Sequence, residues 1–169
     1  MRILVLYYSF TGNTQKVAKA IADRLNAELG EITCQSYYAW NGPLLQALHI
    51  FTRGLPRVEV LTPPHARYDL TLIGAPVWGG RPAPPVVRAL RDHKADIGKA
   101  ALFVTCRGAN PTYGPERALD EMAAEIEGPV VAMRTFREPE IRTGGYRQGV
   151  EEFVHTLGIP VPARGKTIV

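Results

Sequence analysis

The chain has few cysteines and no long apolar run, and these two features exclude several classes of protein. Only Cys34 and Cys106 occur among its 169 residues. Two cysteines are too few for a disulfide framework, and neither has a partner at the spacing of metal ligands. No stretch approaches the roughly 18 apolar residues of a membrane-spanning helix, and the opening run over residues 3–8 is too short for a secretion signal. We therefore expect a cytoplasmic protein with no membrane span and no metal site.

Several enzyme signatures are also missing. A cysteine-dependent phosphatase needs an arginine six positions after its cysteine, but Thr112 and Trp40 stand there. The late sequence Gly165-Lys166-Thr167 is similar to the end of a phosphate-binding P-loop, yet Pro160 occupies the position of its first glycine. No acid and base are paired near one site, so we predict no hydrolase and no catalytic residue.

The length and composition of the chain suffice for one globular domain. The chain is 46% hydrophobic and 21% charged, and its length allows a sizeable core. It contains no internal repeat, low-complexity segment or linker. We predict one domain over residues 1–158 and a tail over residues 159–169, which contains Pro160 and Pro162.

Apolar runs alternate with helical patterns along the chain. Strands are expected at residues 3–8, 31–37, 70–75, 100–105 and 129–133. Helices are expected from the first strand to about residue 30, at 41–53, after the prolines at 82–85, around 119–126, and from about 144. This alternation is typical of an α/β fold, in which helices cover both faces of a parallel sheet.

The most informative stretch runs over residues 5–18, where an apolar strand leads directly into a hydroxyl-rich turn that opens a helix. The first turn of a helix offers unpaired N–H groups and a partial positive charge, and both favour a phosphate group. The turn has no lysine or arginine, so a dianion would be held by neutral donors, which argues against a nucleotide triphosphatase. The residues predicted to form this binding loop are Ser9, Phe10, Thr11, Gly12, Asn13 and Thr14, among which Ser9, Thr11 and Thr14 offer hydroxyl donors.

Position by position, this turn resembles the phosphate loop of the flavodoxin family. The shared order is an apolar pair, an aromatic, Ser9, two residues, Gly12, one residue, Thr14, three residues and Ala18. The resemblance covers most of the chain. It implies an FMN cofactor and a flavodoxin-like doubly wound three-layer sandwich, whose five parallel strands have the order 2-1-3-4-5. An ordinary capped strand-turn-helix is the alternative for this loop taken alone.

In that arrangement the ligand lies beyond the carboxyl ends of the strands, where the strand order reverses. The loops after the first, third and fourth strands would meet there. The second of these loops places an aromatic beside two glycines, and its predicted cofactor-binding residues are Pro76, Val77, Trp78, Gly79 and Gly80.

Trp78 looks like the residue that stacks on the flavin ring in flavodoxins, because an indole can cover a broad apolar plane. Gly79 stands where the family uses a small residue whose peptide turns over when the flavin is reduced, a change that costs little without a Cβ. The alternative for Trp78 is an aromatic that merely covers the edge of the sheet.

The third loop resembles the part of the family that holds the polar edge of the ring. By this resemblance, the backbone around Arg107 and Gly108 would bond that edge and Tyr113 would cover the other ring face. Cys106 fits a core residue at a strand end better than a redox thiol. The cofactor-binding residues predicted here are Thr105, Cys106, Arg107, Gly108 and Tyr113.

The net charge of the chain differs from the charge that is typical of flavodoxins. Flavodoxin carriers are typically acidic, whereas this chain has a formal net charge of +4, and residues 53–99 hold eight lysines and arginines against four acids. We expect Arg81 and Arg107 to bracket the ring site and to favour its reduced, anionic form. The positive electrostatic field of these basic residues favours anionic partners. The alternative is that the basic residues only keep the surface soluble.

We predict a redox protein that transfers electrons through bound FMN. One alternative is an NAD(P)H-dependent FMN oxidoreductase acting on a quinone or a similar acceptor, and another is a flavin-free binding module with the same fold. The expected partner is a redox protein or a small-molecule electron acceptor rather than a nucleic acid, with the oligomeric state left open.

Overall fold

The computed structural model describes residues 1–62, 64, 68–108 and 114–160. Its sheet is built on five parallel strands: β1 (Ile3–Tyr7), β2 (Glu28–Thr33), β4 (Leu70–Trp78), β6 (Ala100–Cys106) and β7 (Val130–Arg137). They lie in the order β2-β1-β4-β6-β7. The predicted parallel sheet and its strand order are confirmed.

Two short strands extend this sheet to seven. β3 (Glu59–Val60) pairs antiparallel with β2 at one edge, and β5 (Arg81–Pro82) pairs antiparallel with the end of β4. The turn between β4 and β5 consists of Gly79 and Gly80, whose φ angles are 56° and 76°. A two-residue hairpin turn with two positive φ angles favours glycine. Two-residue strands have no periodic pattern, so the sequence did not predict them.

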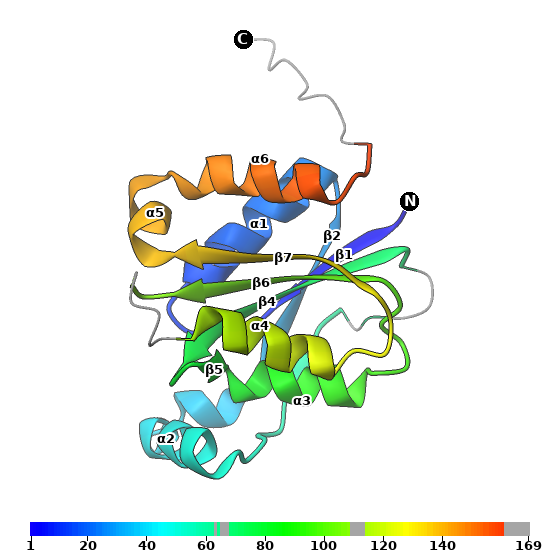
Figure 1. Cartoon of the computed structure of the whole chain (residues 1–169). Coiled ribbons are helices and arrows are strands. Elements are labelled where there is room, and N and C mark those ends of the chain that lie inside the picture. The colour runs from blue at the N-terminus through cyan, green and yellow to red at the C-terminus, as the bar shows by residue number, and fades with distance from the viewer. Residues whose placement is uncertain (63, 65–67, 109–113, 161–169) are drawn as a thin grey trace.

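Helices cover both faces of the sheet (Figure 1). One face carries α1 (Asn13–Leu25), α5 (Glu138–Thr143) and α6 (Tyr146–Thr156), and the other carries α3 (Pro84–Asp92) and α4 (Pro115–Ala124). The helical turn η1 (Gln35–Tyr38) leads into α2 (Gly42–Thr52), which lies beyond α3 in Figure 1. The predicted three-layer α/β sandwich is therefore confirmed. None of the described helices combines the length and apolar character that a membrane crossing requires.

The sheet divides the core into two parts because successive side chains of a strand point to opposite faces. Leu4 and Leu6 of β1 pack on the α3/α4 side, whereas Val5 and Tyr7 pack on the α1/α6 side. Ile159, in the predicted tail, still packs against the α1/α6 side. Residues 161–169 lie outside the described part, so the tail stays a prediction.

Three buried phenylalanines form a cluster on the α1/α6 side: Phe103, Phe136 and Phe153, here called the phenylalanine cluster. Their ring centres lie 6.2 to 6.4 Å apart, edge to face. Gly74 of β4 lies opposite Phe103 in the strand register. A Cβ on Gly74 would overlap the Phe103 ring, so the absent side chain gives this ring its space.

Two predicted boundaries near the amino terminus are wrong. α1 ends at Leu25 rather than near residue 30, because Asn26 adopts the left-handed conformation and donates its N–H to the carbonyl of Ala22. β2 consequently begins at Glu28, and residues 35–37 of the predicted strand lie in η1 (Gln35–Tyr38) instead.

Two strands, β4 and β7, extend further at their carboxyl ends than predicted. β4 continues beyond residue 75 to Trp78, where pairing with β5 supplies partners that the apolar pattern does not reveal. β7 continues beyond residue 133 to Arg137, and α5, which was not predicted, begins immediately after it. The N–H of Arg137 donates to Oε1 of Glu140 at 3.0 Å, which fixes the start of α5.

Candidate functional site

Three loops at the carboxyl ends of β1, β4 and β6 enclose a cavity of about 310 Å³, here called the loop cavity. It is lined by Thr11, Asn13, Pro76, Val77, Trp78, Gly79, Gly80, Thr105, Cys106, Arg107 and Glu138. All of these except Glu138 are predicted site residues, so the structure brings together residues from all three predicted loops. Ser9, Phe10, Gly12, Thr14 and Gly108 belong to the same loops without lining the cavity, and Tyr113 lies outside the described residues.

The first loop leaves the start of α1 open. Gly12 has a φ of 88° and donates its N–H to the Ser9 hydroxyl at 3.1 Å, which closes the turn. As the residue before α1, Gly12 has no side chain that could cap the first N–H groups of the helix. These donors and the helix dipole are therefore available to an anion beside Thr11 and Asn13.

A hydroxyl pair joins the first loop to the third. The Oγ1 atoms of Thr14 and Thr105 are 2.8 Å apart and both side chains are buried. Only one of the two hydroxyl hydrogens can lie between these oxygens, so the other is free to be donated elsewhere. The residues are 91 positions apart in the chain, so no local pattern predicted their contact.

Trp78 is part of a second group of aromatic residues, here called the tyrosine–tryptophan cluster: Tyr8, Tyr37 and Trp78, with Phe10 and Tyr38 at its outer edge. The rings of Tyr8 and Phe10 meet the indole nearly at right angles, each with its centre 5.9 Å away. The indole is half-buried and lines the loop cavity. It is therefore held by its neighbours while it borders the cavity.

The hydroxyl of Tyr8 is buried and has no hydrogen-bond partner within the described part of the chain. Burial raises the pKa of Tyr8 well above its ordinary value, and the pKa of Tyr37 is raised for the same reason. The Tyr37 hydroxyl differs in having a partner, Nδ1 of His49, at 2.8 Å.

The third loop is held by a residue that the sequence did not predict. Arg137, at the end of β7, donates to the carbonyl of Gly108 through Nη1. Cys106 ends β6 and is buried, as expected for a core residue at a strand end. Burial raises the pKa of the Cys106 thiol, and nearby Arg137 partly opposes that rise. β7 was expected to end earlier, so Arg137 and Glu138 were not placed at this edge.

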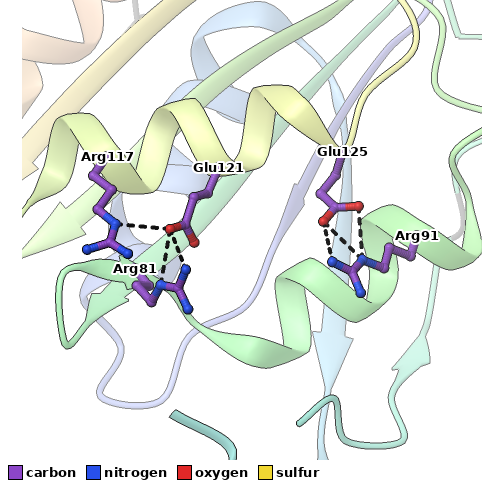
Figure 2. A network of polar contacts seen from close by, with 5 residues as sticks. All are labelled: Arg81, Arg91, Arg117, Glu121 and Glu125. Carbon is purple, nitrogen blue, oxygen red and sulfur yellow. Dashed lines mark hydrogen bonds and ion pairs between the residues drawn. The ribbon is translucent and has the colours of Figure 1, made fainter. Parts of the chain in front are cut away.

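The expectation that Arg81 brackets the loop cavity is wrong. Arg81 pairs directly with Trp78 across the β4–β5 hairpin, so both side chains lie on the face of the sheet that α3 and α4 cover. There Nε and Nη2 of Arg81 donate to Oε1 of Glu121 at 3.0 and 2.8 Å, and Nε of Arg117 donates to the same oxygen at 3.1 Å. Figure 2 shows Glu121 between the two arginines, beside a second pair formed by Arg91 and Glu125.

Arg107 lines the loop cavity as predicted, but its charge is opposed. Its Nε lies 3.7 Å from Oε2 of Glu138, and its side chain is 89% exposed. Water and salt screen such an exposed charge strongly. The charged residues in the cavity lining, Arg107 and Glu138, therefore balance each other. The described residues include no group of three or more histidine, cysteine or acidic side chains placed to hold a metal ion.

A second cavity of about 330 Å³ lies on the other side of the Trp78 loop, between the end of α2 and helices α3 and α4. Its apolar wall includes Ile50, Leu55, Val87 and the Trp78 indole. Arg53, Arg81 and Arg91 line it together with Glu121 and Glu125. The sequence did not predict this cavity, because its walls come from segments far apart in the chain.

No model of a known protein family matches the sequence, and no curated protein matches it. Solved structures do match. The crystal structure of a flavoprotein in complex with FMN from Lactobacillus acidophilus is 27% identical, covers 84% of this chain and 97% of its own, and has a TM-score of 0.66. The apo-form of the flavoprotein from the same organism, solved by NMR, is 28% identical, with coverages of 79% and 91% and a TM-score of 0.61.

A flavodoxin from Pseudomonas aeruginosa, solved as a cysteine-to-serine mutant, is 17% identical, and its match covers 94% of this chain and 100% of its own, with a TM-score of 0.55. At that identity the match shows the fold alone. Together with the strand order and the position of the three loops, these matches lead to one conclusion: the chain has a flavodoxin-like fold.

Proposed function

We propose that the protein binds FMN in the loop cavity and transfers electrons through it. The proposal depends on one observation, which is that an open helix start, buried threonine hydroxyls, a half-buried indole and a diglycine turn meet around a single cavity. It is supported by the likeness to a flavoprotein whose structure holds FMN. Bound FMN would supply the redox chemistry, while the chain supplies binding and electrostatics.

The start of α1 is the part that would hold the phosphate. The first N–H groups of the helix and the hydroxyls of Thr11 and Thr14 are neutral donors. If Thr105 donates to Thr14, the Thr14 hydrogen is free for a phosphate oxygen. The charges of Arg107 and Glu138 balance, so binding would not depend on a nearby cation.

The rest of the cavity would hold the ring. Trp78 offers an apolar surface, and Tyr8, Phe10 and Tyr37 already contact its indole, so little side-chain freedom would be lost on binding. Arg137 holds the third loop through the Gly108 carbonyl. The cavity is therefore preorganised for a flat ligand.

The test begins with an absorption spectrum of the purified protein and a titration with FMN. Thr14→Val should then weaken FMN binding about tenfold, the effect of losing one hydrogen bond to a charged group, and should leave riboflavin binding unchanged. Thr71→Val, a buried threonine of β4 away from the site, is the matched control. Protein that neither retains flavin nor binds FMN below about millimolar would refute the proposal and favour a flavin-free binding module.

The second cavity favours one further candidate, an NAD(P)H-dependent FMN oxidoreductase. It borders the same indole as the loop cavity, and within the described residues Arg53 has no ion pair, whereas Arg81 and Arg91 are paired with Glu121 and Glu125. Arg53 is therefore available to an anionic substrate.

This candidate requires the purified holoprotein to oxidise NADH or NADPH with a quinone, without an added reductase. Arg53→Gln should then raise the KM for the anionic substrate and leave FMN binding unchanged. Absence of turnover would favour an electron carrier.

A further inference from the structure

One face of α2 is apolar and exposed. Four side chains define it, and their exposed fractions are 96% for Trp40, 75% for Leu44, 52% for Leu48 and 87% for Phe51. Leu44, Leu48 and Phe51 are four and three positions apart, so they follow one stripe along α2, and Trp40 lies in the turn before the helix. We call these four residues the α2 face.

The opposite side of α2 is occupied by the body of the protein. Leu45 packs against the core on the α3/α4 side, and Ile50 lines the second cavity. The exposed apolar stripe is therefore not a misplaced core face. Large exposed apolar patches are uncommon on monomeric proteins and typically mark interaction sites.

The surroundings of the α2 face are unusual in charge. Residues 32–58 contain no aspartate or glutamate, and their only lysine or arginine residues are Arg53 and Arg57, at and beyond the end of α2. The stripe itself therefore carries no charge that would oppose close contact with another apolar surface.

We propose that the α2 face is the interface of a symmetric dimer, in which α2 packs antiparallel against α2 of a second copy. The patch has a suitable size. An aromatic side chain contributes roughly 150–250 Å² when buried, so Trp40 and Phe51, together with the two leucines, approach the roughly 600 Å² per partner at the lower end of stable interfaces.

The antiparallel orientation follows from the position of Arg53. In that orientation the basic ends of the two α2 helices lie at opposite ends of the interface, while the Arg53 side chain stays in the lining of the second cavity. The two copies of Arg53 are then roughly 20 Å apart, from the rise of about 1.5 Å per residue, which exceeds the screening length of about 8 Å. A parallel pair would instead bring the two arginines together.

A lipid surface fits less well than a second copy. An anionic membrane attracts nearby basic residues, and this segment offers only two arginines, both at one end. The remaining apolar stripe complements an identical stripe equally along its whole length. The proposal does not depend on flavin binding.

The first test measures the mass of the purified protein, with any cofactor it retains, by sedimentation equilibrium over a wide range of concentration. We expect a dimer that dissociates on dilution, and the double variant Leu44→Gln/Phe51→Ser should weaken dimerisation at least tenfold. Leu61→Ser is the matched control, because Leu61 is also an exposed leucine but lies after β3. A monomer at all concentrations, or a dimer that the double variant leaves unchanged, would overturn the proposal.

The second test uses the orientation of the helices and does not require the interface to be disrupted. With a short bismaleimide, Leu48→Cys should cross-link to its own copy faster than Trp40→Cys, since position 48 lies near the middle of the stripe and position 40 at its end. The native cysteines are buried and serve as a low background. Equal rates would overturn the antiparallel arrangement. Flotation of a monomer with phosphatidylserine vesicles, lost in the double variant, would assign the face to lipid instead.

Discussion

The two aromatic clusters, one on each side of the sheet, differ in composition and in what surrounds them. The phenylalanine cluster has no polar atoms and is closed on all sides by α1, α6 and the strands. The tyrosine–tryptophan cluster has hydroxyls, one of them without a partner among the described residues, and its indole borders both cavities. Similar rings therefore form a closed apolar core on one side of the sheet and border two cavities on the other.

The largest expected effect is on the closed cluster. Phe153→Ala should lower the free energy of unfolding by about 3–5 kcal/mol, because it leaves a cavity that the neighbouring phenylalanines cannot fill. Phe10→Ala, at the exposed edge of the other cluster, should cost about 1 kcal/mol or less. Urea unfolding of both variants measures the difference. Equal losses in the free energy of unfolding would contradict the proposed difference between the two clusters.

The next effect concerns ligand binding rather than stability. Trp78→Ala should weaken FMN binding by about 1–3 kcal/mol, through loss of a large aromatic contact, and should restore the fluorescence of bound FMN. A fluorescence titration measures both quantities. Trp40→Ala is the control, since Trp40 lies on the α2 face. Unchanged affinity and quenching in Trp78→Ala would place the flavin away from the indole.

A smaller effect appears at alkaline pH. Burial raises the pKa of Tyr8, so above pH 10 the unfolded chain loses a proton that the folded chain retains, and stability falls as the pH rises. Tyr8→Phe removes this loss and should spare roughly 1 kcal/mol at pH 10.5. Urea unfolding at pH 8 and pH 10.5 tests this, with Tyr146→Phe, outside both clusters, as the control. If the free energy of unfolding of both variants falls between pH 8 and pH 10.5 as much as that of the parent, the Tyr8 hydroxyl is not buried.

The smallest expected effect is that of Arg81. Its guanidinium is engaged by Glu121, so Arg81→Gln should leave the midpoint potentials of bound FMN unchanged within about 10 mV. Arg107→Gln should lower them by at most about 40 mV, from roughly 1 kcal/mol of screened interaction, and less at high salt. Spectroelectrochemical titration measures both. A larger shift for Arg81→Gln would mean that Arg81, not Arg107, acts on the flavin.

The sequence predicted the centre of the fold well because the buried strands are continuous apolar runs. β4 and β6 are covered on both faces, so burial alone identifies them. The residues of the loop cavity other than Glu138 were also predicted, since each of the three loops follows such a strand directly and the strand order then places the loops together.

The remaining features depend on contacts between distant segments. The Thr14–Thr105 pair spans 91 positions, and the direction of Arg81 is decided by a hairpin turn. The helical pattern of residues 41–53 predicted α2 correctly, but it could not show that one apolar stripe of this helix has no cover in the monomer. Periodicity identifies an apolar face and leaves its partner unspecified.

The contact between Gly74 and Phe103 has a consequence for related sequences. The ring of Phe103 occupies the space in which a Cβ of Gly74 would lie, so neither position can change freely while the other stays as it is. In relatives that keep this packing, an alanine or a larger residue at the first position should be accompanied by a smaller residue at the second. The two positions should therefore covary across an alignment, and the pair would identify β4 and β6 as neighbours without any structure.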